Sequence, residues 1–151
     1  MSQNEKWNKR FVNLAHEVAG WSKDQSTKVG AVIIDDQRKP KSFGYNGFPR
    51  GVDDNIPSRN ERPAKYLFSE HAERNAIYNA DSSLDGCTIF VTHFPCADCT
   101  RAIIQKGIKR VVIDSKNGKE SGLKERWGEA FEASVEMMEE AGIEFEEVDL
   151  D

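Results

Sequence analysis

The sequence contains two short motifs, His71-Ala72-Glu73 and Pro95-Cys96-Ala97-Asp98-Cys99, which together supply one imidazole and two thiols. These groups are three of the four ligands that a tetrahedral zinc ion takes, and a zinc site with three protein ligands leaves its fourth position to water. Glu73 is too close to His71 along the chain to be a comfortable fourth ligand, but it is close enough to face that water. The motifs therefore predict a catalytic zinc centre with Glu73 as general acid and base.

This combination suits the hydrolysis of an amine from an aromatic ring. Zinc lowers the pKa of a bound water to about 7, so that hydroxide is available to attack the amine-bearing carbon of a cytosine. One group must then take a proton from the water, pass it to the ring nitrogen and protonate the leaving amine, and a single carboxylate can do all three. The pattern resembles the H-x-E…P-C-x-x-C signature of zinc-dependent base deaminases.

A Cys-x-x-Cys pair on its own has two other interpretations, a redox pair or half of a structural zinc site. The redox interpretation expects the pair near the start of a thioredoxin-like βαβ unit and needs no His-x-Glu motif. Here both motifs are present, with 21 residues between Glu73 and Pro95. The sequence therefore favours catalytic zinc, with a structural zinc or an inactive site as the alternative.

Length and composition indicate one domain over residues 1–151, large enough to bury a core. Hydrophobic residues make up 38% of the chain and charged residues 31%. We find no apolar run of 18 residues and no basic-then-apolar leader after Met1, so we expect a cytoplasmic protein without a membrane span. Two of the three cysteines belong to the metal motif, and Cys87 is left unpaired, which argues against a disulfide framework.

The net charge of −5 is unevenly distributed. Residues 120–151 hold twelve acidic and two basic residues, a charge of −10, which leaves +5 for residues 1–119. A nucleic-acid binder normally shows a strong basic patch, and no such block occurs here. We therefore expect a small anionic substrate such as a mononucleotide, and no nucleic-acid partner.

Hydrophobic patterns predict alternating helices and strands. The continuous apolar run 29–34 is typical of a strand buried on both faces, and it forms a hairpin with a strand over 41–46. A first helix ends at Gly20, and a last helix ends at Gly142. The other predicted elements are a helix over 71–80, a strand over 87–92, a helix over 96–106, a strand over 110–114 and a strand over 143–149. This order predicts an α/β fold with a mixed five-stranded sheet and helices on both faces.

Some side chains on these elements are interpreted as structural. His16 lies beside the apolar stripe of the first helix and has no companion ligand nearby. Ser69 is a candidate N-cap for the helix that follows it. His93 precedes the metal motif, where it either contacts the substrate or supports the site from behind. The last helix is interpreted as core packing through one apolar stripe: Trp127, Ala130, Phe131, Val135 and Met138.

The stretch Gly44-Tyr45-Asn46-Gly47-Phe48-Pro49-Arg50-Gly51 interrupts the strand pattern. Its glycines allow the backbone to approach a ligand while the Asn46 amide binds it, although an ordinary turn fits the composition equally well. Residues 47–70 then show no periodicity, and connections of this length are usually functional or disordered. Four cations of this segment are candidate ligands for a phosphate or a nucleotide effector, although its acidic residues balance their charge: Arg50, Arg59, Arg62 and Lys65.

The chain resembles the deoxycytidylate (dCMP) deaminases of the cytidine-deaminase superfamily over essentially its whole length. The discriminating stretches are residues 22–32, 44–51 and 71–77, because the metal motifs alone indicate only a zinc deaminase. The resemblance implies a three-layer α-β-α, cytidine-deaminase-like fold. It also implies a homo-oligomer, often a hexamer, activated by dCTP and inhibited by dTTP with Mg2+, in a bacterium or a virus-infected host cell.

The same resemblance assigns roles to residues. It makes His71, Cys96 and Cys99 the zinc ligands, and it makes Glu73 the proton shuttle. It also implies three sets of substrate contacts: Asn46 holds the sugar or base, the backbone of Ala72 faces the pyrimidine carbonyl, and Ser26 and Thr27 line the edge of the pocket.

Two departures from the family pattern concern the metal and the phosphate. Some viral members carry a second, structural zinc, but Cys87 is the only spare cysteine here, so we expect one Zn2+ per chain. Many regulated members have a tyrosine-rich segment with an adjacent Arg that reaches the substrate phosphate. The corresponding segment here is Ser115-Lys116-Asn117-Gly118-Lys119, in which Lys119 is a candidate phosphate or effector ligand.

The sequence hypothesis is hydrolysis of dCMP to dUMP and ammonia, which feeds thymidylate synthesis. One alternative is a zinc deaminase that acts on a tRNA or single-stranded DNA base, which should show a basic or aromatic strand-binding surface. A second is a pyrimidine deaminase of flavin synthesis. A third is a non-catalytic zinc-stabilised module linked to DNA uptake, against which the intact Glu73 argues.

Overall fold

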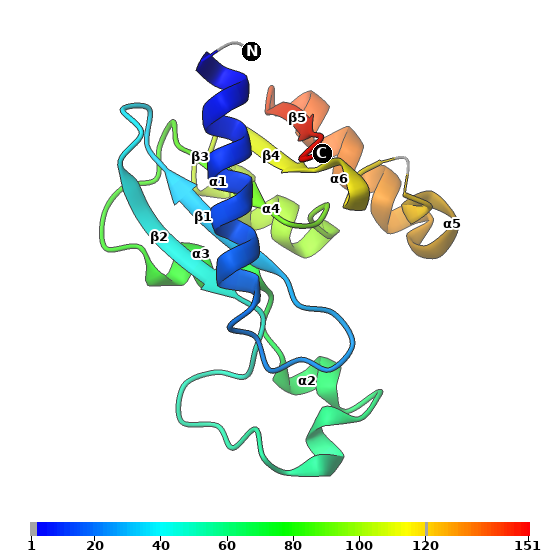
Figure 1. The fold of residues 1–151 in the computed structure, drawn as a ribbon. Helices are drawn as coiled ribbons and strands as arrows, with labels where there is room; N and C mark the ends of the chain where they lie inside the picture. Colours follow the sequence, from blue (N-terminus) through cyan, green and yellow to red (C-terminus); the bar gives the residue numbers. More distant parts are fainter. Residues whose placement is uncertain (1–2, 120) are drawn as a thin grey trace.

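A five-stranded mixed sheet forms the centre of the molecule, in the order β2-β1-β3-β4-β5 (Figure 1). The computed structural model describes residues 3–119 and 121–151. β1 is antiparallel to both β2 and β3, whereas β3, β4 and β5 run parallel to one another. The strands are β1 (Gly30–Ile34), β2 (Pro40–Tyr45), β3 (Thr88–Val91), β4 (Arg110–Asp114) and β5 (Glu144–Val148). The predicted mixed sheet and its edge strand β5 are confirmed.

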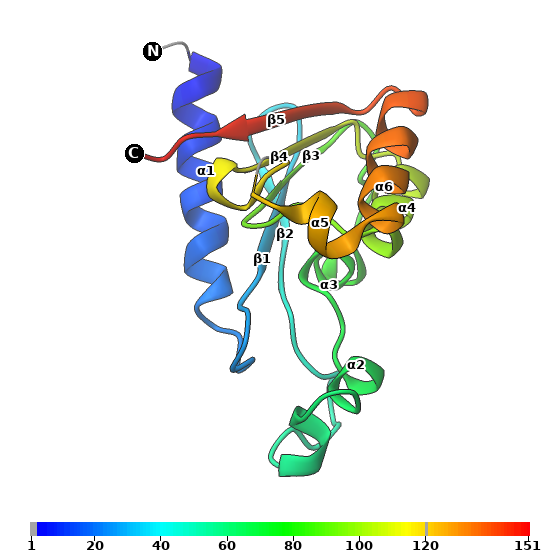
Figure 2. The same cartoon turned by 90° about the vertical axis from the view of Figure 1, so that its right-hand side faces the viewer.

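Helices cover both faces of this sheet. The helix α1 (Gln3–Ala19) crosses one face alone, and the other face carries α3 (Ala72–Asn79), α4 (Ala97–Gln105) and α6 (Glu129–Glu140), as Figure 2 shows. Four shorter elements lie in the connections: η1 (Pro57–Asn60), α2 (Lys65–Phe68), η2 (Ser115–Asn117) and α5 (Leu123–Trp127). The three-layer arrangement is therefore as predicted.

The middle of the sheet is buried on both sides, as the continuous apolar run predicts. All five residues of β1 are buried. Ala31 and Ile33 belong to the core beneath α3, α4 and α6, while Val32 and Ile34 belong to the core beneath α1. Because successive side chains of a strand point to opposite faces, one strand contributes to both cores.

Helix α4 ends as its sequence predicts. Gly107 has φ +80°, its N–H donates to the carbonyl of Ile104 at 3.0 Å, and the N–H of Ile108 donates to the carbonyl of Ile103 at 3.3 Å. This pair of bonds is a Schellman motif, which satisfies the last carbonyls of the helix.

The single helix predicted between the loop and Gly142 is wrong, because it is divided into α5 and α6. Gly128 between them has φ +50° and ψ −118°, a backbone conformation that favours glycine and that interrupts the helical path. Phe131 and Met138 are buried as predicted, but Ala130 is exposed and Trp127 is 41% exposed. The predicted core stripe therefore begins only at Phe131.

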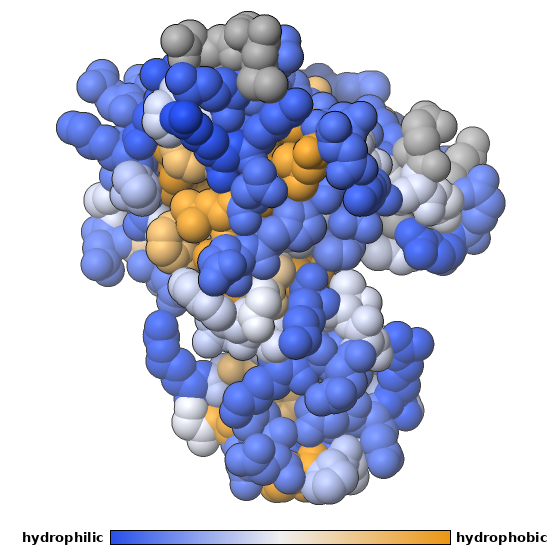
Figure 3. All heavy atoms as spheres, in the orientation of Figure 1, coloured by the Kyte–Doolittle hydropathy of each residue, from blue (hydrophilic) through white to orange (hydrophobic). Residues whose placement is uncertain are grey.

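Residues 47–70, here called the projecting segment, extend away from one end of the sheet (Figure 1). Both of its ends are joined by an isolated bridge, in which Gly47 and Glu70 exchange backbone hydrogen bonds of 3.1 and 2.7 Å. Figure 3 shows that the visible surface of this projection is mainly hydrophilic. Within the described residues, no helix has the length and apolar character needed to cross a bilayer.

Candidate functional site

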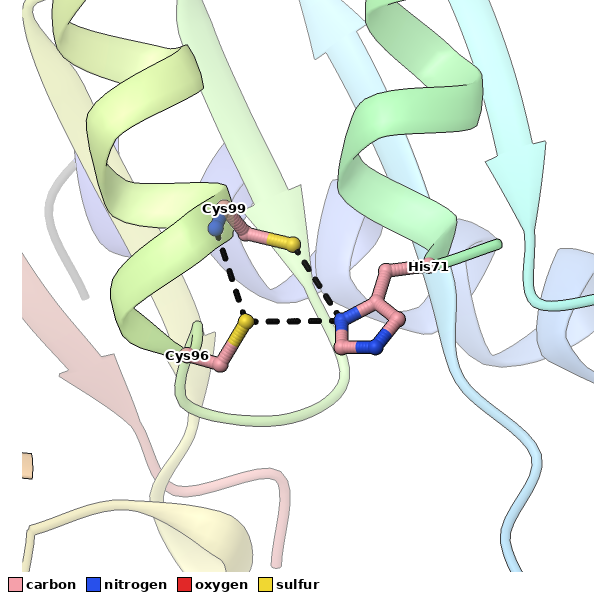
Figure 4. Close-up of side chains that lie close together, drawn as sticks. All are labelled: His71, Cys96 and Cys99. Carbon is pink, nitrogen blue, oxygen red and sulfur yellow. Dashed lines mark hydrogen bonds between the residues drawn. The ribbon is translucent and has the colours of Figure 1, made fainter. Parts of the chain in front are cut away.

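The N-terminal ends of α3 and α4 face each other, and His71, Cys96 and Cys99 meet between them (Figure 4). His71 is the N-cap of α3 and Cys96 is the N-cap of α4, so the predicted cap Ser69 is wrong. His71 Nδ1 lies 3.4 Å from each of the two sulfurs, and the three candidate ligand atoms all lie within 4.8 Å of one another. The two motifs are thus brought together as the sequence predicts.

This geometry fits a tetrahedral zinc ion. Zn–S bonds of about 2.3 Å and Zn–N bonds of about 2.0 Å at tetrahedral angles place N and S about 3.5 Å apart. The hydrogen bond from Cys99 lowers the pKa of Cys96 to about 4, against the opposing effect of burial. A thiolate, the form that binds metals, is therefore present at neutral pH.

Glu73 lies in the first turn of α3 and is only 4% exposed. Burial, followed by the negative charge of Cys96, raises its pKa to about 7. A carboxyl group with a pKa near 7 can both accept and donate a proton at neutral pH. Glu73 therefore has the properties that a general acid and base requires.

Helix α3 is held directly against strand β2, which fixes the position of His71 and Glu73. The Ser42 hydroxyl donates to the carbonyl of Ala76 at 2.7 Å, and the Asn75 side chain donates to the carbonyl of Tyr45 at 2.9 Å. Gly44 packs against the backbone of Ala72 and Ala76. The prediction that this glycine admits a ligand is wrong, because the space beside it is filled by α3.

A cavity of about 560 Å³ is lined by Glu73 and by two of the candidate metal ligands, His71 and Cys96. Four further residues selected from the sequence line it: Ser26, Thr27, Asn46 and Ala72. The Asn46 side chain also organises the wall, since its Oδ1 accepts from the N–H of Val29 at 2.8 Å and its Nδ2 donates to the carbonyl of Thr27 at 2.9 Å. The structure therefore brings these predicted substrate residues to one place.

Two of the candidate phosphate or effector residues, Arg50 and Lys119, do not line this cavity. Arg50 donates to the Asn79 side chain at 3.0 Å, at the far end of α3 from the site. The ammonium group of Lys119 lies 4.9 Å from the ring of Phe145, and its backbone N–H donates to Glu147. The structure thus gives no support to either residue as a phosphate ligand at this cavity.

Other cavity residues complete the wall, and among them only Arg62 and Lys65 were considered from the sequence, as candidates for a phosphate or effector. Asp24 and Lys65 form an ion pair of 3.3 Å, with side chains that are 14% and 12% exposed. Arg62, Tyr66 and Trp127 line the cavity as well. Asp24, Tyr66 and Trp127 were not selected as site residues, because they come from segments without periodicity or from a misassigned helix, where the sequence carried no local signal for them.

The two histidines outside the metal motif, His16 and His93, lie in different surroundings. His16 pairs with Asp114 at 2.8 Å and is outside the candidate metal group, in agreement with the structural interpretation. His93 lines the cavity, and its Nδ1 lies 2.7 Å from the hydroxyl of Thr92. Burial, together with the positive charge of His16, lowers the pKa of His93.

Comparison with known proteins gives the family. Residues 5–115 match the model described as the cytidine and deoxycytidylate deaminase zinc-binding region. The chain belongs to this family. The matched range includes His71, Cys96 and Cys99, and in a zinc-binding deaminase this His-Cys-Cys group fits Zn2+.

Individual deaminases of this family are similar over most of the chain. The "uncharacterized deaminase in luxG 3′ region" of Aliivibrio fischeri is 46% identical over 146 residues, which cover 97% of this chain and 96% of that protein. The "probable deoxycytidylate deaminase" of Caenorhabditis elegans is 37% identical over 147 residues, covering 95% and 70% respectively. The crystal structure of the dCMP deaminase of cyanophage S-TIM5 in complex with dCMP and dUMP has a TM-score of 0.73 at 25% identity, covering 97% and 98%.

Proposed function

We propose that this chain is a zinc-dependent deaminase that hydrolyses dCMP to dUMP and ammonia, and so supplies the precursor of thymidylate. The observation that carries the proposal is the His71, Cys96 and Cys99 cluster, because two of its members line the same cavity as the buried Glu73. The relatives named deoxycytidylate deaminase support dCMP as the substrate.

In this proposal His71, Cys96 and Cys99 would hold one zinc ion per chain, which when bound supplies a water of lowered pKa. Glu73 accepts a proton from the attacking water and delivers it to the ring nitrogen beside the amine-bearing carbon. Glu73 then takes the second proton, from the hydroxyl now bonded to that carbon, and passes it to the amine; the carbon–nitrogen bond breaks, ammonia leaves, and the ring carbon keeps the oxygen as a carbonyl. Its pKa of about 7 suits both directions of transfer.

The substrate would be held by the remaining predicted residues of the wall. The first N–H groups of a helix have no partner within it, so the backbone N–H of Ala72 at the start of α3 is suited to the pyrimidine carbonyl. The Asn46 amide uses one N–H and one lone pair on the wall, which leaves one of each for the sugar or base. Ser26 and Thr27 would complete the edge of the pocket.

The resemblance to regulated dCMP deaminases further supports a homo-oligomer, with a hexamer favoured, and control by dCTP and dTTP together with Mg2+. The position of Glu73 supports catalysis over a purely zinc-stabilised module, because burying a carboxyl group in a cavity beside thiolates costs stability that a structural role would not require.

The test compares the zinc-loaded protein with Glu73→Gln, using Glu136→Gln on the exposed side of α6 as the matched control. Ammonia release is measured with cytidine, dCMP, CMP, dCTP, an RNA hairpin and a single-stranded DNA, with and without dCTP and Mg2+, and zinc is measured by mass spectrometry. We expect dCMP to be the preferred substrate. We expect Glu73→Gln to retain zinc and to lose about 10²- to 10⁴-fold in turnover.

Normal turnover by Glu73→Gln would remove Glu73 from the mechanism. A zinc-loaded protein that leaves dCMP untouched under every condition while deaminating another substrate would defeat the proposal.

A further inference from the structure

A second cavity, of about 470 Å³, continues from the first one toward α5. The two cavities share much of their lining, including Arg62, Tyr66, His93 and Trp127. The larger cavity is lined by His71, Cys96 and Glu73, whereas Arg126 of α5 lines only the second. A ligand placed with its reacting end at Glu73 therefore has room to extend toward Arg126.

The second cavity is positively charged. Two of its described lining residues, Arg62 and Arg126, are arginines, and none of them is an aspartate or a glutamate. This is unusual within a chain whose net charge is −5 and whose last 32 residues carry −10. The second cavity thus combines two cations with no described carboxylate to neutralise them.

The pairing of nearby cations strengthens the contrast. Lys65 is neutralised by Asp24 and Arg74 by Glu70, with ion-pair distances of 3.3 and 2.6 Å. Within the described part of the chain, Arg62 and Arg126 have no ion pair. Arg62 lies 5.9 Å from the ring centroid of Tyr66, and Arg126 makes a long contact of 3.5 Å with the carbonyl of Ser121. Their guanidinium groups therefore keep most of their donors for a ligand.

We infer that the second cavity binds the 5′-phosphate of the nucleotide, with Arg62 and Arg126 as its ligands. This inference rests on the proposed deaminase function, and it names the two residues of this chain that would select a nucleotide over a nucleoside. A planar guanidinium donates two parallel hydrogen bonds to a phosphate, and two of them match the double negative charge of a monoester. The phosphate would thus be bound by two arginines that are 64 positions apart, one in the projecting segment and one in α5.

A mononucleotide fits these observations better than a nucleic-acid strand. Binding a strand uses many phosphate contacts along a basic track, and its affinity depends on the number of cations. Here Arg62 and Arg126 lie together at one cavity, and the chain as a whole is acidic.

The experiment uses the zinc-loaded protein with Arg62→Gln and Arg126→Gln. Arg10→Gln is the matched control, since Arg10 is exposed on α1, which lies on the opposite face of the sheet. Two readouts are compared: kcat/KM for dCMP and for deoxycytidine, and calorimetric binding of dUMP, deoxyuridine, inorganic phosphate and a single-stranded DNA. Zinc content and Tm confirm that each variant is folded.

We expect each cavity variant to weaken dUMP binding and to raise KM for dCMP by about 10- to 100-fold, as for the loss of a charge-assisted hydrogen bond. Deoxyuridine binding and kcat/KM for deoxycytidine should change less than about threefold, a small part of the loss expected for a phosphate contact. Inorganic phosphate should compete with dUMP in the wild type, and the control should match the wild type.

Equal losses for dCMP and deoxycytidine, or unchanged dUMP binding, would overturn the inference. So would tighter binding of single-stranded DNA than of dUMP that depends on the same arginines. If the wild type binds dUMP through these arginines but does not deaminate dCMP, the phosphate site stands and the proposed function fails. The two failures are therefore distinguishable.

Discussion

Gly44 offers a test of how the fold positions the catalytic groups, because β2 and α3 are in backbone contact there. A Cβ added at Gly44 would lie 2.8 Å from the Cα of Ala76 and closer still to the carbonyl oxygen of Ala72 and the amide nitrogen of Ala76. All three are backbone atoms, which cannot rotate away as a flexible side chain could. In Gly44→Ala, α3 must therefore move away from the sheet.

The size of this movement follows from the contacts. Ordinary Cβ contacts begin at 3.4 Å, so α3 must be displaced by roughly 1 Å. Overpacking of this kind costs about 1–3 kcal/mol, which lowers the Tm of a chain of this size by about 3–10 °C. Since α3 carries both His71 and Glu73, a 1 Å displacement should also cost about 100-fold in kcat/KM.

Gly30→Ala is the matched control. A Cβ at Gly30 would lie 2.6 Å from the amide nitrogen of Ala19 and would also meet the carbonyl oxygen of Ala15, so it displaces α1 instead of α3. We expect a similar fall in Tm by calorimetry, but kcat/KM for dCMP within about threefold of the wild type, since α1 carries neither a candidate metal ligand nor Glu73. Gly47→Ala, with no atom within 4 Å of its Cβ, should change neither quantity. Equal losses of activity in Gly44→Ala and Gly30→Ala would refute the reasoning.

Three other predictions follow from the site. Cys99→Ala should lose zinc and show a lower Tm, since metal binding contributes folding free energy, whereas Cys87→Ala should keep one zinc per chain; elemental analysis of both variants would expose an error if they lost zinc alike. Asn46→Ala should lower the free energy of unfolding by about 1–3 kcal/mol, because it leaves two backbone groups of the wall without partners, and urea denaturation that matched the wild type would contradict this. Burial acts to raise the pKa of Asp24, but the hydrogen bonds from the backbone N–H groups of Thr27 and Ser26 outweigh this effect and hold the pKa below its usual value. The stabilisation by the ionised Asp24 is therefore present above the pKa of the unfolded chain and is lost as pH falls through the pKa of the folded protein. Urea midpoints between pH 6 and 3 should therefore fall less steeply in Asp24→Asn, and parallel curves would count against it.

The parts of the molecule that sequence reasoning predicted have local signals. The run at β1 is continuous because the strand is buried on both faces. His71, Cys96 and Cys99 could be grouped because each motif places its ligands at the start of a helix. There the spacing of residues along the chain determines which way their side chains point. Family resemblance then supplied Asn46 and Ala72, which the structure places at the same cavity.

The features that sequence reasoning missed depend on contacts between residues that are far apart in the chain. The partner of Gly44 is a helix 28 or more positions later, so glycine in the sequence indicated only conformational freedom. Hydrophobic periodicity contains no information on backbone dihedral angles. The helix predicted from it therefore ran through Gly128 and included Trp127. Arg62 and Arg126 became a pair only when the chain was folded.

The bridge between Gly47 and Glu70 has a consequence for how such an enzyme can change. Because the intervening chain departs and returns at a single point, lengthening it adds little closure entropy, about 0.6 kcal/mol for each doubling. Insertions or exchanges there would leave the two facing helix ends undisturbed. The nucleotide that the enzyme accepts can therefore evolve separately from the machinery that breaks its carbon–nitrogen bond.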